Sequence, residues 1–191
     1  MIGELPTALE IGGTSYSIRS DFRVALNIIQ AMNDPELNER EKCWVCMKCL
    51  YTDFESIPDE MYEEAAKKAY WFIGGGDIPM SSTDIKTFDW HQDESLIFSA
   101  VNKTAGFEIR TPDRYTHWWT FLGYFAEIGE GMFSQITYIR TKQAKGKKLE
   151  KWEKEFVREH RELITLKKQL SAEEEQHARE DEAFINDLIG R

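Results

Sequence analysis

The stretch from His117 to Arg140, HWWTFLGYFAEIGEGMFSQITYIR, constrains the fold of this chain more than any other part of the sequence. It places aromatic and aliphatic residues at helical spacing on two faces, and a helix that is apolar on two sides is buried between neighbours. Gly123 has no side chain, so we expect a neighbouring helix to approach it closely. Gly129 and Gly131 break the pattern and allow the backbone to reverse. The stretch therefore predicts two core helices joined by a turn.

The paired tryptophans of this stretch have two interpretations. Tryptophan pairs can bind sugars or stack on bases, but no basic groove accompanies this pair. Because aromatic side chains bury large apolar areas, we favour a core position for Trp118, Trp119 and Phe121. We expect the second helix to begin near Phe133, with Ser134 as its cap and with Ile136, Ile139 and Tyr138 directed inward.

Arg140 closes the stretch at the edge of the expected core. Its guanidinium group could form a buried ion pair with Glu127 or Glu130, or it could project into solvent. The sequence leaves these alternatives open.

The rest of the chain predicts a small hairpin and further helices. Apolar residues alternate around Gly12 and Gly13, over residues 7–11 and 15–18, which is typical of a β-hairpin. Capping and breaking residues bound helical patterns over 22–32, 36–54, 59–73 and from Asp89 to Gly106. The predicted fold class is mainly α: a single helical domain with an N-terminal hairpin and a protruding, charged C-terminal helix.

Charge divides the chain and excludes some classes of partner. The 191 residues carry a net charge of −10. Residues 1–140 hold 12 basic and 22 acidic side chains, whereas residues 141–191 hold 12 of each. We therefore predict a helical core domain over 1–140, with the hairpin in 1–20, and a charged amphipathic helical extension over 141–191. An acidic chain without a long apolar run predicts a cytoplasmic protein whose main partner is neither nucleic acid nor membrane.

Two groups of residues invite a chemical interpretation. Cys43, Cys46 and Cys49 have the residue types of a metal site, but a fourth ligand is missing and free cysteine is commonly a small buried apolar residue. Asp89, His91 and Asp93 could be ligands or an acid–base pair, but they do not share a helical face. The favoured interpretation is that Asp89 caps a helix and that Gln92 reaches back to its backbone. We expect no cofactor, no metal and no enzymatic activity.

The C-terminal extension carries an apolar seam at heptad-like spacing. Such a seam packs against another helix, either within the chain or on a partner, and the sequence leaves both possibilities open. Glu159 interrupts the seam, which argues against a long coiled coil. The candidate partner-binding residues are Leu149, Trp152, Phe156, Leu163, Leu166 and Leu170.

Several segments together resemble one known family. The resemblance covers most of residues 1–152 and is strongest from residue 88 onward. The segments that carry it are Asp89-Trp90, FSAVNK at 98–103, Phe107, HWWTF at 117–121, ITYIR at 136–140 and KGKKLEKW at 145–152. They resemble the tail assembly chaperones of long-tailed bacteriophages and of prophages of Gram-positive bacteria. The family-marker residues are Asp89, Trp90, His117, Trp118, Trp119, Phe121 and Arg140.

This resemblance implies a non-enzymatic role in virion morphogenesis. Such chaperones bind the tape measure protein and keep it soluble until the tail tube polymerises around it. The implied partners also include the major tail protein, a second chaperone product and further copies of the chain. The resemblance places the protein in the host cytoplasm and not in the mature virion. The alternative is a structural tail or connector protein that is retained in the particle.

Overall fold

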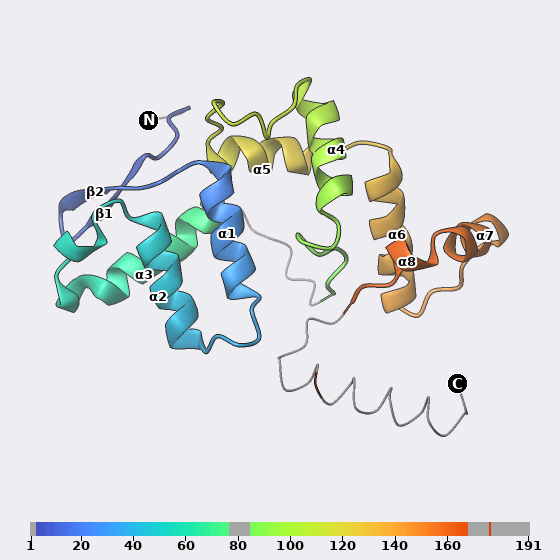
Figure 1. Ribbon diagram of the computed structural model, residues 1–191, viewed down its shortest axis with the longest axis horizontal. Coiled ribbons are helices and arrows are strands. Elements are labelled where there is room, and N and C mark those ends of the chain that lie inside the picture. Colours follow the sequence, from blue (N-terminus) through green and yellow to red (C-terminus); the bar gives the residue numbers. More distant parts are fainter. Residues whose placement is uncertain (1–2, 77–84, 168–175, 177–191) are drawn as a thin grey trace.

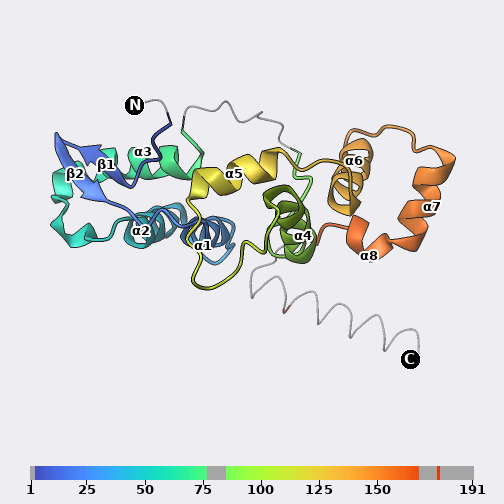
Figure 2. The ribbon, with the colours of Figure 1, turned by 90° about the horizontal axis from the view of Figure 1, so that it is seen from above.

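The computed structural model describes residues 3–76, 85–167 and 176, and these residues form a mainly α-helical structure with one two-stranded sheet. The predicted fold class is thereby confirmed. The molecule is elongated (Figure 1). The sheet and helices α2 and α3 lie at one end, α6, α7 and α8 lie at the other, and α1, α4 and α5 lie between them. The view from above shows the same order along the long axis (Figure 2).

The N-terminal hairpin forms where the sequence predicts it. Strands β1 (Ala8–Ile11) and β2 (Thr14–Ser17) pair antiparallel, with Ile11 opposite Thr14. The turn residues Gly12 and Gly13 have φ angles of 55° and 79°, a left-handed conformation that favours glycine. Leu9 and Ile11 are buried, so the apolar face of β1 belongs to the core.

The three helices that follow build the N-terminal part of the core. Helix α1 (Phe22–Met32) begins as predicted, because Asp21 accepts a hydrogen bond from the Arg23 backbone N–H. Helix α2 (Glu39–Leu50) is shorter than the predicted 36–54, because Asn38 and Glu41 form a capping box at its start. Helix α3 (Tyr62–Ile73) follows two single 3-10 turns, Phe54–Ser56 and Asp59–Met61.

Helices α4 (Glu94–Ala105) and α5 (Trp118–Ala126) complete the main core. Gly106 ends α4 as predicted, in a left-handed conformation with φ of 78°. The expected close approach of a helix to Gly123 is wrong: this residue is exposed and no atom of another element lies within 4 Å of the position that its Cβ would occupy. The reason is that α5 packs on α1 and α4 through the face of Trp118 and Phe121 and leaves its opposite face to solvent.

Helices α6 (Met132–Ala144), α7 (Lys151–Glu159) and α8 (Arg161–Ile164) form the other end of the molecule. Ser134 does not cap α6 itself: the cap is Gly131, whose backbone N–H donates to Ser134 Oγ. Ile136 and Ile139 are fully buried as predicted, but Tyr138 is 52% exposed and does not pack inward. Helix α6 runs across residue 140, and the division into domains at that residue stays a prediction.

The described part of the C-terminal extension folds back. Ile164 packs with Ile136 and Ile139 in a small second core, and Leu149, Phe156 and Val157 pack against this group. The backbone breaks at His160, between α7 and α8, so the predicted seam is not one continuous helix. Residues 168–175 and 177–191, the rest of the predicted C-terminal extension, lie outside the described residues.

Candidate partner-binding surface

The aromatic family-marker residues are structural. Trp118 is buried, and its indole N–H donates to the carbonyl of Ile73 at 2.8 Å. The indole N–H of half-buried Trp119 donates to the carbonyl of Phe72, also at 2.8 Å. Both bonds satisfy carbonyls at the C-terminal end of α3, where a helix has no internal partners for them. The paired tryptophans therefore join α5 to α3.

His117 fixes the start of α5. Its Nδ1 accepts a hydrogen bond from the Trp119 backbone N–H at 3.0 Å, which makes His117 the N-cap of the helix. Since Nδ1 is the acceptor, Nε2 carries the proton and donates to the carbonyl of Pro6 at 2.9 Å. The imidazole is buried between these partners. The two hydrogen bonds of the imidazole hold the N-terminal segment against α5.

Asp89 stabilises the turn that precedes α4 by accepting from backbone N–H groups as predicted, but the group that reaches back to it is not the predicted one. Its carboxylate accepts hydrogen bonds from the backbone N–H groups of His91 and Gln92 at 3.0 and 2.9 Å, and from Lys86 Nζ at 2.6 Å. Burial raises the pKa of Asp89, but these hydrogen bonds outweigh burial and hold the pKa below its usual value. The group that reaches back to the Asp89 N–H is Asp93, at 2.9 Å. The capping box with Gln92 is therefore wrong, because α4 begins only at residue 94.

Arg140 pairs with Asp93, which none of the sequence alternatives included. The two side chains are buried and joined by two hydrogen bonds, of 2.6 Å from Nη1 and 2.9 Å from Nη2. The guanidinium group also donates to the carbonyls of Thr87 and Ile164, at 3.0 and 3.1 Å, and to that of Leu163. The pairing with Glu127 or Glu130, and the exposed orientation, are thus wrong.

The segment after α8 is held against the same turn. Gln92 Nε2 donates to the carbonyl of Thr165 at 2.8 Å, and Gln92 Oε1 accepts from the Lys167 backbone N–H at 2.9 Å. Together with Arg140, this side chain ties the end of the described extension to the start of α4. We call the contacts of Asp89, Gln92, Asp93 and Arg140 the polar junction.

A second buried charge attaches α7 to α6. Glu153 is fully buried, and its carboxylate oxygens accept hydrogen bonds of 2.6 and 2.7 Å from Lys142 Nζ. It also accepts a 2.6 Å bond from the Glu150 backbone N–H. The hydrogen bond from Lys142 lowers the pKa of Glu153, and burial opposes this only in part. Sequence reasoning missed this pair because Glu153 looks like one of many surface carboxylates.

The predicted partner-binding residues differ in their burial. Leu149 and Phe156 pack against the small core, and Leu166 is half-buried. Trp152 and Leu163 are 47% and 37% exposed. Leu170 lies outside the described residues.

The same end of the molecule exposes two further large apolar side chains, Met132 and Tyr138, which are 42% and 52% exposed. Half of the exposed large apolar side chains in the described residues lie on α6–α8. We call these four residues the apolar surface: Met132, Tyr138, Trp152 and Leu163.

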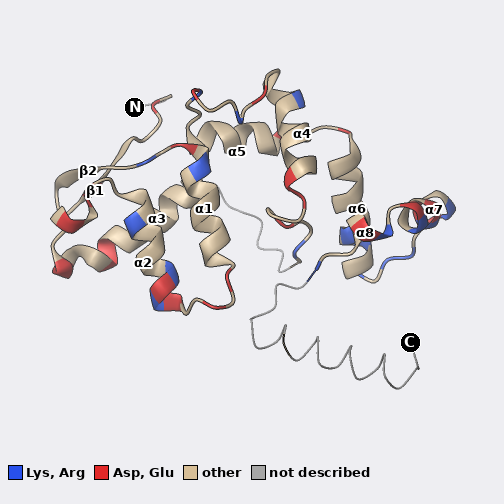
Figure 3. Ribbon diagram, viewed as in Figure 1, with Lys and Arg blue, Asp and Glu red and all other residues tan. Residues whose placement is uncertain are grey.

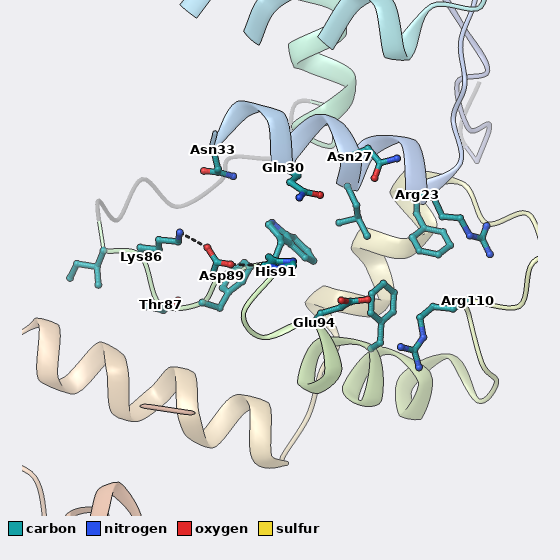
Figure 4. A pocket seen from close by; sticks show the side chains of 16 residues that line it. Arg23, Asn27, Gln30, Asn33, Lys86, Thr87, Asp89, His91, Glu94 and Arg110 are labelled. Atoms are coloured by element: carbon teal, nitrogen blue, oxygen red, sulfur yellow. Dashed lines mark hydrogen bonds and ion pairs between the residues drawn. The ribbon is translucent and has the colours of Figure 1, made fainter. Parts of the chain in front are cut away.

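A cavity of about 650 Å³ lies between α1 and the start of α4. Figure 4 shows Asn27 and Gln30 of α1 on one side of it, with Asp89, His91 and Glu94 on the other. Its floor is aromatic, from Phe22, Phe88, Trp90 and Phe98. The sequence gives no signal for this cavity, because its walls come from segments about sixty residues apart.

Several of the residues considered for chemistry are engaged in packing or in ion pairs. No group of three or more Cys, His, Asp or Glu side chains that could hold a metal occurs within the described residues. Burial raises the pKa of Cys46 to about 12, which keeps its sulfur protonated. Asp93 is engaged with Arg140, and Asp89 with Lys86.

Comparisons with known proteins place the chain in a family. In the part of the chain that the structure describes, no helix has the length and apolarity needed to cross a membrane. Searches of the curated proteins and of the solved structures give no match. A family model described as Bacteriophage Gp15 protein matches residues 1–166, which include the polar junction and helices α1 to α8. The chain therefore belongs to the bacteriophage Gp15 protein family.

Proposed function

We propose that this protein is a non-enzymatic tail assembly chaperone, which binds the tape measure protein in the host cytoplasm and keeps it soluble until the tail tube polymerises. Membership of a bacteriophage family supports a role in virion morphogenesis. The finer role rests on one observation, the concentration of exposed large apolar side chains on α6–α8. Exposed apolar groups gathered at one end of a molecule mark a binding surface, because their burial on a partner is favourable.

The apolar surface suits a partner that is a long helix. Trp152 and Leu163 lie on two short consecutive helices, α7 and α8, and both side chains are exposed. A helix with an apolar stripe can bury both against itself. The charged residues around them keep the free protein soluble and do not contribute strongly to affinity. The major tail protein and a second chaperone product are further proposed partners.

Co-expression with fragments of the tape measure protein tests this function. We expect the fragments to stay soluble with the wild-type chain and to co-purify with it. The double variant Trp152→Ala, Leu163→Ala should lose both effects, because it removes apolar surface without touching the small core. The matched control is Leu5→Ala, Trp44→Ala, which truncates side chains of the same types that are each 45% exposed at the other end of the molecule.

Two outcomes would count against the proposal. If the solubility of the fragments is the same with and without the wild-type chain, the protein is not their chaperone. If mass spectrometry finds the protein in purified virions at the stoichiometry of a tail component, it is a structural protein of the particle. A chaperone that is displaced by tail-tube subunits should be absent from the virion.

A further inference from the structure

A groove of about 560 Å³ lies between α6 on one side and α7 and α8 on the other. The groove is lined by five basic side chains and by no carboxylate. Three of the five are neutralised: Arg140 pairs with Asp93, Lys86 with Asp89, and Arg158 with Glu155 at 3.4 Å. Lys154 and Arg161 are exposed, and no carboxylate of the described residues pairs with them. We call this feature the basic groove.

The charge around the groove differs from that of the rest of the molecule. Residues 141–167 carry nine basic and five acidic side chains, whereas residues 3–76 carry seven basic and thirteen acidic ones. Figure 3 shows Asp and Glu around the start of α3 and the hairpin at one end, and Lys and Arg around α8 and the end of α6 at the other. The molecule is therefore polarised along its long axis.

The complementary surface lies at the far end of the same chain. Residues 53–63 contain five carboxylates, all exposed, and no lysine or arginine. Glu55 pairs with Lys48, and Glu63 pairs with Lys67. Asp53, Asp59 and Glu60 have no ion pair in the described residues, and we call these three the acidic edge.

We propose that the basic groove binds the acidic edge of a second copy of this chain, so that copies associate head to tail. The two surfaces lie at opposite ends of an elongated molecule, and one copy cannot bring its own edge to its own groove (Figures 1 and 3). Contacts between two different surfaces of identical chains close into a ring or, where the rotation between copies does not close, leave one groove and one edge free at the two ends of an open assembly. Such an assembly grows along one direction, which suits a sleeve of copies on an extended partner.

The experiment is sedimentation velocity of the purified full-length chain over a range of concentrations, at low and high salt. Ion pairs at exposed sites are individually weak and are screened within about 10 Å at 0.1 M salt and about 3 Å at 1 M salt. We therefore expect concentration-dependent association at low salt that high salt abolishes. The groove variant Lys154→Glu, Arg161→Glu and the edge variant Asp53→Lys, Glu60→Lys should each be monomeric. An equimolar mixture of the two variants should associate again, since the reversed surfaces are complementary.

Two controls separate specific contact from net charge. Lys147→Glu, Lys148→Glu changes the net charge as the groove variant does, at exposed positions that do not line the groove. Glu127→Lys, Glu130→Lys changes the net charge by as much as the edge variant does, at exposed positions in the middle of the chain. Both controls should associate like the wild type, and circular dichroism should show that every variant is folded.

The proposal is overturned by a wild-type chain that stays monomeric at low salt, or by variants that associate as the wild type does. It is also overturned if the mixture of variants stays monomeric. Because the experiment contains no tape measure protein, its outcome is independent of the chaperone function.

Discussion

Arg140 holds together parts of the chain that are far apart in sequence. It lies on α6, pairs with Asp93 before α4, and donates to carbonyls of the segment before that turn and of α8. Its side chain is 3% exposed and that of Asp93 is 1% exposed, so removing either partner leaves a buried charge without its ion-pair partner. Such a loss is far more costly than the net gain from forming the pair. Arg140 is therefore a positioning residue for α8.

We predict that Arg140→Gln lowers the free energy of unfolding of the α6–α8 end by about 3–5 kcal/mol, the usual cost of breaking a buried ion pair. The matched control is Lys67→Gln, which breaks the exposed pair with Glu63 and should cost far less, because solvent screens an exposed pair. Urea denaturation followed by circular dichroism measures both. Equal costs for the two variants would contradict the role that we assign to the polar junction.

The polar junction contains contacts that local sequence patterns do not predict. The pattern of Asp89 and Gln92 predicts a capping box, yet Asp93 makes the backward bond to the Asp89 N–H, and the same carboxylate pairs with the distant Arg140. No local pattern carries that information. The same applies to Glu153, whose burial depends on Lys142 eleven residues away in the chain.

At the scale of elements, local capping made some helix ends predictable, although the local box of Asn38 and Glu41 at the start of α2 was missed. Helix α1 begins after Asp21 and α4 ends at Gly106, as expected, because these residues act on their immediate neighbours. The seam over 149–170 was misleading, because heptad-like spacing does not show that the backbone breaks at His160. The basic groove and the aromatic cavity were not predictable at all, since tertiary packing alone brings their walls together.

The attachment of α7 to α6 should depend on pH through Glu153. Its folded-state pKa is lowered by Lys142, below the ordinary value of about 4.3. When folding lowers the pKa of a carboxyl group, its stabilising contribution is complete at pH values above the ordinary pKa. This contribution is lost as the pH falls through the folded-state pKa. We predict that Glu153→Gln has a lower Tm than the wild type at neutral pH, and that the difference shrinks as the pH falls below about 4.

Calorimetry of both proteins between about pH 7 and pH 3 measures this difference. The control is Glu155→Gln, whose carboxylate is exposed and makes only a 3.4 Å contact with Arg158. It should show no comparable dependence on pH. A constant gap in Tm between the wild type and Glu153→Gln would show that the charge of Glu153 does not attach α7.

At the scale of the whole molecule, the apolar core is unequally divided. The main core joins the hairpin to helices α1 to α5 and includes Phe133 at the start of α6, whereas the second core has only three buried apolar residues, Ile136, Ile139 and Ile164. Burying an isoleucine contributes about 1.5–3 kcal/mol. The α6–α8 end therefore has little apolar stabilisation of its own with which to offset the loss of a partner from the Arg140 or Glu153 pair.

This division predicts that the α6–α8 end opens while the rest stays folded, because elements with few buried apolar contacts open at a lower free energy. Amide hydrogen exchange measures the opening directly. We expect the α6 amides around Ile139 to exchange with a smaller free energy of opening than those of α5 around Phe121, and with a weaker dependence on added denaturant. Equal opening free energies in α5 and α6 would mean that the two cores unfold as one unit. An end that opens alone exposes Ile136, Ile139 and Ile164 beside the apolar surface, and so enlarges the area available to a helical partner.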